Sequence, residues 1–144
     1  MSKQKIVTRE TKMADVIHMN FLLLPVINRF DIKLGFGDKT VEQVCSDYGI
    51  NMSFFLDIIN TYHDPEYFPL DKMREYPIDL IVDYLLKSHE HYTQKMLPET
   101  EQMIDDLADS CRNNCDNLKL IEDFYKRYKK ELENHLKSEE EKFF

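Results

Sequence analysis

Apolar residues recur along the second half of the chain with the spacing of two long amphipathic helices. The first predicted helix spans residues 78–111, and the second spans residues 118–144. In each, the apolar positions lie three and then four residues apart, which places them on one helix face. The first stripe consists of Ile78, Val82, Leu85, His89, Tyr92, Met96, Met103 and Leu107, and the second of Ile121, Phe124, Tyr128, Leu132, His135, Glu139 and Phe143. Two such helices joined by a short turn predict an antiparallel hairpin, with a bend where Pro98 interrupts the first helix.

The chain before these helices divides into a small helical unit, residues 1–64, and a linker, residues 65–77. Residues 11–30 have helical apolar spacing, which Pro25 should kink or break. The linker holds three prolines and three aromatic residues, which indicates a segment that packs against something. We therefore predict an all-α protein, in which a small N-terminal domain precedes a helical hairpin at residues 78–144.

Two helix starts within the small unit carry capping signals. Thr40 followed by Gln43 has the pattern of a capping box, and Asn51 can cap the next helix. The resulting pair has the proportions of a helix–turn–helix. Its second helix, residues 53–62, contains no Lys or Arg that could contact DNA. We therefore expect a protein-docking unit and not a DNA-binding one.

Composition favours helix and argues against several classes of function. Three glycines and five prolines favour helix over strand, and 42% hydrophobic residues suffice for a core. The net charge of -8 makes nucleic acid a poor partner. The longest apolar run is too short to cross a membrane, and residues 1–5 do not begin a signal peptide, so we expect a cytoplasmic protein. Its three cysteines, Cys45, Cys111 and Cys115, are then expected to be reduced.

Three polar residues occupy positions in the stripes where an apolar residue is expected. His89 lies in line with Leu85, and His135 lies in line with Leu132. Glu139 follows His135 by four positions, so the two share one face about one helical turn apart. A buried carboxylate is costly without a partner, and a metal cation removes that cost by binding both side chains. The same residues are also compatible with a hydrogen-bonded core histidine and a solvated acidic face.

Other candidate residues are less well placed for chemistry. His91 lies on a different helix face from His89, which suits an exposed or supporting position. Cys111 and Cys115 are four residues apart, but without a second thiol pair they fit incidental cysteines better than a zinc site. No Gly-rich phosphate loop, nucleophile elbow or Cys–His dyad is evident, so nothing points to a conventional enzyme.

Three segments, taken in their order along the chain, resemble a known family. Residues 89–98, which end in Met-Leu-Pro, look like the first ligand helix of hemerythrin-like di-iron proteins. Residues 135–140, with Phe144 beyond them, look like the second ligand helix, whose pattern is a His, three residues, two acids and a distant Phe. Residues 30–45 are similar to the short N-terminal domain of the repair-of-iron-centres family, in which that domain precedes a hemerythrin-like bundle.

The resemblance implies both a cofactor and a function. It assigns His89, His135 and Glu139 as ligands of a non-haem di-iron centre, with Glu139 as a bridging carboxylate. It implies repair of iron–sulfur clusters damaged by nitrosative or oxidative stress, with iron–sulfur cluster proteins as partners. An oxygen or nitric oxide sensor or carrier of the hemerythrin type is the near alternative. A metal-free helical protein-interaction module is the alternative from a different class.

Two departures from the family pattern change these expectations. The Cys-Cys-Gly-Gly turn of the family's N-terminal domain reads Leu-Gly-Phe-Gly at residues 34–37, so no thiol function is expected there. The family's bundle has four helices, whereas this chain stops at Phe144 after a hairpin, which cannot bury its own apolar face. We expect a homodimer in which two copies supply four histidines and two carboxylates to one site. A natural chain that continues beyond Phe144 is the alternative.

Overall fold

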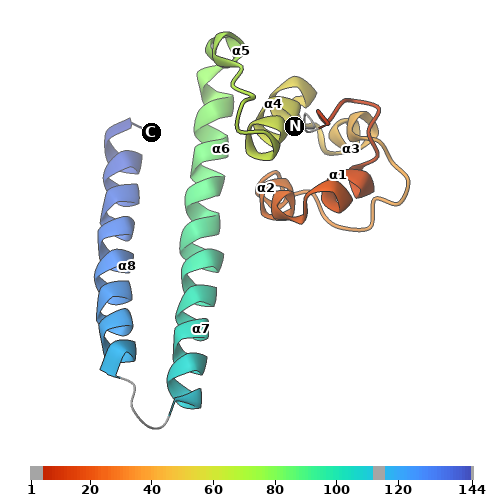
Figure 1. The fold of residues 1–144 in the computed structure, drawn as a ribbon. Helices are drawn as coiled ribbons and strands as arrows, with labels where there is room; N and C mark the ends of the chain where they lie inside the picture. The colour runs from red at the N-terminus through yellow and green to blue at the C-terminus, as the bar shows by residue number, and fades with distance from the viewer. Residues whose placement is uncertain (1–4, 112–115, 144) are drawn as a thin grey trace. The chain divides into compact units, whose positions relative to one another are not determined.

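The computed structural model describes residues 5–111 and 116–143 (Figure 1). Over these ranges the chain is 76% helical and contains no β-strand, only an isolated bridge between Lys12 and Thr40. The all-α prediction is therefore confirmed. The chain divides between Ile81 and Val82 into two compact units, each with a fold of its own.

The first unit begins with short helices around Pro25. Helix α1 (Met13–Met19) is followed by a 3-10 helix, η1 (Phe21–Leu23), and by α2 (Leu24–Arg29). The predicted helical stretch is thus interrupted between α1 and η1 and again before α2. Pro25 stands in the first turn of α2, where its missing N–H group has no helical partner to lose.

The next two helices of this unit begin at the predicted caps. Helix α3 (Val41–Tyr48) starts after a complete capping box, in which the Thr40 hydroxyl and the Gln43 amide each bond the other residue's backbone N–H. Helix α4 (Met52–His63) starts after Asn51, whose side-chain oxygen accepts a hydrogen bond from the first turn. Both capping predictions are confirmed.

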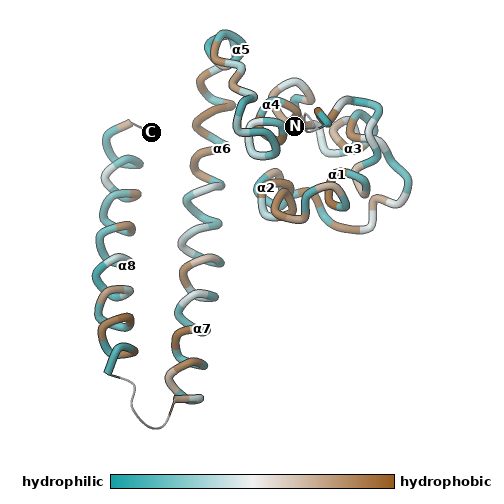
Figure 2. The backbone as a smooth tube through the Cα atoms, viewed as in Figure 1, coloured by the Kyte–Doolittle hydropathy of each residue, from teal (hydrophilic) through white to brown (hydrophobic). Residues whose placement is uncertain are grey.

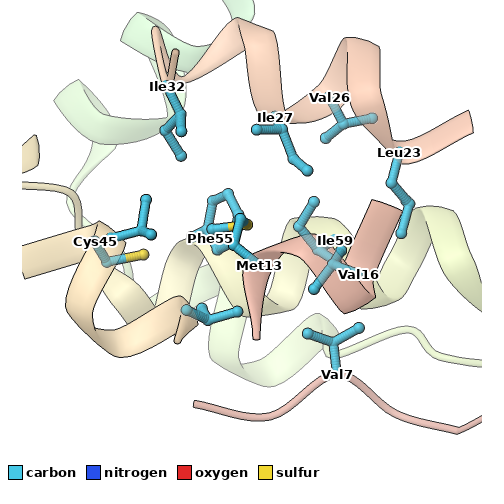
Figure 3. Packing of buried hydrophobic residues seen from close by; sticks show 12 residues of the cluster. Val7, Met13, Val16, Leu23, Val26, Ile27, Ile32, Cys45, Phe55 and Ile59 are labelled. Carbon is cyan, nitrogen blue, oxygen red and sulfur yellow. The ribbon is translucent and has the colours of Figure 1, made fainter. Parts of the chain in front are cut away.

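The core of the first unit gathers side chains from α1 to α4 (Figure 3). Phe55 is fully buried, and its ring packs edge-to-face against Phe30 with 5.0 Å between centroids. The burial of these apolar side chains is what stabilises the unit. The buried members of this core are Val7, Met13, Val16, Leu23, Val26, Ile27, Ile32, Val41, Val44, Cys45, Phe55 and Ile59.

Asp57 of α4 holds residues 65–77, the segment predicted as a linker, against α4 within the first unit. Its buried carboxylate accepts hydrogen bonds from the hydroxyl groups of Tyr67, at 2.7 Å, and of Tyr76. Lys72 Nζ lies 4.0 Å from the same carboxylate. Helix α5 (Leu70–Glu75) lies between the two tyrosines, so the segment is partly helical and is held to α4 at both ends.

The second unit is an antiparallel pair of long helices. The first is continuous over 33 residues and consists of α6 (Ile78–His91), a π-helical turn, η2 (Tyr92–Met96), and α7 (Leu97–Ser110). The second is α8 (Asp116–Phe143), drawn in blue in Figure 1. The predicted hairpin is confirmed. The second unit begins at Val82, so the first turn of α6, residues 78–81, belongs to the first unit.

The hairpin leaves most of its predicted apolar stripe exposed. Met103 is 68% exposed and Phe124 is 65% exposed, and Figure 2 shows apolar positions recurring along both helices. This agrees with the expectation that two helices alone cannot bury such a face. The buried side chains of the unit, among the described residues, are Tyr84, Ser88, His89, Leu97, Tyr125 and Leu136.

The cysteines differ from one another in chemical state. Cys45 is a free thiol in the core of the first unit, and burial raises its pKa to about 11. Cys111, which follows α7, is disulfide-bonded. The prediction of three reduced cysteines is therefore wrong for Cys111. Cys115 lies outside the described residues.

Candidate metal centre

Pro98 shapes the helix that carries His89. Proline lacks a backbone N–H group, and its ring clashes with the carbonyl group four residues earlier in a regular α-helix. The backbone meets this constraint with the π-helical turn η2, at whose end the Leu97 N–H bonds to the carbonyl oxygen of Tyr92, five residues back. The predicted interruption is therefore present as a π-turn directly after His91. Such turns often accompany functional sites.

His89 lies in the last turn of α6 and faces two carboxylates of α8. Its Nδ1 atom is 3.0 Å from Glu140 Oε1, and its Nε2 atom is 3.4 Å from Glu139 Oε2. The 3.0 Å contact is a hydrogen bond with the Glu140 carboxylate, and the 3.4 Å contact places the Glu139 carboxylate beside the other ring nitrogen.

Glu139 lies between His89 and His135, with one carboxylate oxygen toward each imidazole. Its Oε1 atom is 2.8 Å from His135 Nε2, one helical turn earlier in α8. The exposed fraction of the side chains rises from 8% at His89 to 35% at Glu139 and 68% at His135. The cluster is therefore closed on the α6 side and open on the His135 side.

The three residues predicted as metal ligands thus come together in the structure. Imidazole nitrogen and carboxylate oxygen suit divalent iron, so the chemistry of the donor set fits the expected metal. Their donor atoms are engaged with one another at hydrogen-bonding distances. Within the described residues, no group of three or more His, Cys, Asp or Glu side chains is arranged to hold a metal ion.

Glu140 is the member of the cluster that the sequence reasoning missed. Its place as the second acid of the His–x–x–x–Glu–Glu pattern is the sequence signal that could have indicated it. Neighbouring residues of a helix point about 100° apart. Which of the two acids reaches α6 therefore depends on the rotation of α8, and here both reach His89.

Two further histidines in helices, His91 and His63, have other neighbours. The His91 ring packs edge-to-face against Tyr92, with 6.2 Å between centroids. His63 is buried at the end of α4 in the first unit, where its Nδ1 atom lies 3.4 Å from Asn20 Nδ2.

An apolar groove of about 410 Å³ runs along the hairpin next to the cluster. Phe124 and Tyr128 of α8 stack on this side, with 6.4 Å between ring centroids. His135 follows Tyr128 by seven residues, which puts both on one face of α8. The groove and the open side of the cluster therefore share that face. Both helices line the groove, with Tyr92, Met96, Ile104, Ile121, Phe124 and Tyr128 among its residues.

The resemblance of residues 30–45, 89–98 and 135–140 to hemerythrin-like repair proteins stays a prediction from the sequence. In the described ranges, no helix is both long enough and apolar enough to cross a membrane. No protein-family model, no curated protein and no solved structure matches the chain.

Proposed function

We propose that this chain is a non-haem di-iron-binding protein of the hemerythrin-like type. In this proposal it acts in the cytoplasm in the repair of iron–sulfur clusters damaged by nitrosative or oxidative stress. The observation that carries the proposal is the position of Glu139 between the Nε2 atoms of His89 and His135. These three side chains would hold the iron, with Glu139 as the shared carboxylate ligand and His89 and His135 as the nitrogen ligands.

The residues of the cluster would have different roles. His89 and His135 would hold the metal through Nε2, and Glu139 would be the shared carboxylate ligand. Glu140 accepts a hydrogen bond from His89 Nδ1, which would select the tautomer in which Nε2 can bind a metal. The burial of His89 keeps water from one side of the site, and the exposure of His135 leaves the other side accessible. Iron, when bound, supplies redox chemistry and an ion that can pass to a recipient cluster.

A second copy of the chain is the partner that would complete the site. Two imidazoles and one carboxylate are too few to fill the coordination of two iron ions. Two copies together offer four histidines and two bridging carboxylates, so a symmetric homodimer supplies a full set. Damaged iron–sulfur cluster proteins would be the clients, and the net charge of -8 disfavours nucleic acid.

Two other functions have a specific observation in their favour. The apolar groove beside the cluster could admit a small apolar molecule such as oxygen or nitric oxide, which favours a sensor or carrier of the hemerythrin type. The exposed apolar side chains of Met103 and Phe124 favour a metal-free interaction module. Iron binding distinguishes a sensor or carrier from a metal-free interaction module. Reversible binding of oxygen or nitric oxide distinguishes a sensor or carrier from a repair protein.

Metal analysis after anaerobic reconstitution with ferrous iron tests the proposal. The wild-type chain should retain about one iron per chain after gel filtration, because two chains share two ions. Glu139→Gln and His135→Ala should each lose most of this iron. Glu141→Gln and His18→Ala are the matched controls, because both side chains are exposed and lie outside the cluster. A wild-type protein without iron, or a Glu139→Gln variant with undiminished iron, would overturn the proposal.

A further inference from the structure

Exposed apolar side chains follow one line along each helix of the hairpin. On the first helix they include Met96, at the end of η2, and Met103 and Leu107 of α7, spaced seven and four residues apart. On α8 they include Ile121 and Phe124, with half-exposed Tyr128 four residues further on. This spacing is that of a helix face that packs against another helix. Met96 of the first line and Ile121, Phe124 and Tyr128 of the second border the same groove. Met103 and Leu107 extend the first line beyond the groove, and the two lines together are here called the open face.

We propose that a second copy of the hairpin covers the open face, related by a two-fold axis parallel to the helices. Helix α8 of each copy then packs against α7 of the other, which makes a four-helix bundle with antiparallel neighbours. The identity of the occupant rests on the proposed function, because a second copy is what completes the donor set of His89, His135 and Glu139. The orientation of the axis is argued from register and charge.

Contacts within one hairpin determine which residues of α7 and α8 lie at the same level. The Tyr125 hydroxyl donates a hydrogen bond of 2.6 Å to the Leu97 carbonyl oxygen, and Lys129 Nζ lies 2.9 Å from Glu101 Oε2. Arg127, midway between Tyr125 and Lys129, is therefore level with Glu99, midway between Leu97 and Glu101. A two-fold axis parallel to the helices keeps every residue at its level, so Arg127 is also level with the partner's Glu99.

The charges that flank the open face are complementary at these levels. Arg127 and Glu131 border a hollow together with Phe124 and Tyr128, so they flank the apolar line of α8. On α7 the exposed Glu99 stands between Met96 and Met103 in sequence and flanks their line. Arg127 then meets an opposite charge in the partner's Glu99.

The same relation holds one turn further from the loop of the hairpin. Glu131 follows Arg127 by four residues, and Lys95 precedes Glu99 by four, so these two residues are also at one level. Both are exposed, and they carry opposite charges. The two complementary pairs occur twice in a symmetric dimer. A two-fold axis perpendicular to the helices reverses the order of levels in the partner, so it cannot keep both the Arg127–Glu99 pairs and the Glu131–Lys95 pairs in register.

Sedimentation equilibrium of the full chain, before and after reconstitution with ferrous iron, tests this interface. We expect a dimer whose dissociation constant rises about tenfold in Arg127→Glu and in Glu99→Arg, because each reversal places like charges together at two symmetric contacts. The double variant Arg127→Glu/Glu99→Arg should restore the wild-type value, because it exchanges the charges and keeps their complementarity. Lys130→Glu and Asp109→Arg are the controls, since both are exposed and lie away from the open face.

The outcomes test the proposed interface and the proposed function independently of each other. A monomer at all concentrations in both iron states overturns the interface. A dimer whose single variants are unaffected, or whose double variant is not rescued, overturns the parallel axis. A dimer that shows the rescue but binds no iron supports the interface and overturns the di-iron function. Far-UV circular dichroism of each variant verifies that the helices are intact.

Discussion

The Nε2 atom of His89 on α6 lies 3.4 Å from Glu139 Oε2 on α8. This contact joins a buried imidazole to a half-exposed carboxylate from the other helix of the hairpin. Nothing in the local sequence of either helix brings them together, since their proximity follows from the antiparallel register. It is the geometric basis of the proposed metal site.

Replacing His89 should reduce the stability of the iron-free protein, whereas replacing His135 should not. The His89 side chain is almost fully buried between two carboxylates, so His89→Ala should lower the free energy of unfolding by about 1–3 kcal/mol. His135 is largely exposed, so His135→Ala should change it by less than about 0.5 kcal/mol. Urea unfolding followed by far-UV circular dichroism measures both. An equal decrease in the free energy of unfolding in the two variants would contradict the buried position of His89.

Tyr76→Phe should loosen the attachment of α5 to α4 within the first unit. The substitution removes a hydrogen bond to the buried Asp57 carboxylate, which should cost about 1–3 kcal/mol. Hydrogen exchange of α4 amides in the intact chain should then be faster by about tenfold or more. Tyr48→Phe is the control, because that hydroxyl accepts only an exposed hydrogen bond of 3.2 Å from the Lys33 N–H. Unchanged exchange in Tyr76→Phe would show that the contact does not stabilise α4.

The same two tyrosines should make the first unit sensitive to alkaline pH. Burial, together with the hydrogen bond to Asp57, raises the pKa of Tyr67 to about 12, and the same causes raise the pKa of Tyr76. The unfolded chain ionises its tyrosines near pH 10, so between about pH 10 and 12 it binds fewer protons than the folded chain. This contribution is fully present below about pH 10 and is lost as the pH rises toward 12.

Absorbance of tyrosinate during an alkaline titration measures this effect. Of the eight tyrosines, Tyr67 and Tyr76 should ionise after the exposed ones, and only as the first unit unfolds. Tyr67→Phe should remove one of the late-ionising groups and weaken the dependence of stability on pH. A single transition near pH 10 that includes all eight tyrosines would contradict the enclosed position of these two hydroxyl groups.

The Cys45 thiol should be unreactive in the native protein. It is buried in the core of the first unit, and its pKa of about 11 leaves almost no thiolate at pH 8. A disulfide reagent such as Ellman's should therefore react slowly with native protein and rapidly in urea, with Cys45→Ser as the blank. Complete reaction of the native protein within seconds would show that this core opens readily.

Features that depend on neighbouring residues could be predicted from the sequence. The caps at Thr40 and Asn51 need only residues within one turn, and both form as predicted. The two long helices follow from apolar spacing that extends over many turns. The three candidate ligands could be chosen because polar residues interrupt that spacing.

Features that depend on how distant elements meet could not be predicted. The rotation of α8 about its own axis cannot be derived from the sequence, so the contact between Glu140 and His89 could not be predicted. The pairing of Asp57 with Tyr76 joins α4 to a segment that lacks a strong pattern. The π-turn before Pro98 is one of several ways in which a helix can accommodate a proline, and the sequence does not choose among them.

The central claim is that Glu139 bridges two iron ions held by histidines of two chains. Mössbauer spectroscopy of protein reconstituted with isotopically labelled ferrous iron and then oxidised tests it most directly. A carboxylate-bridged pair predicts magnetically coupled ferric ions, about one per chain, and this coupled signal should be lost in Glu139→Gln and retained in Glu141→Gln. Isolated, uncoupled ferric ions, or a coupled signal that survives in Glu139→Gln, would contradict the proposed site.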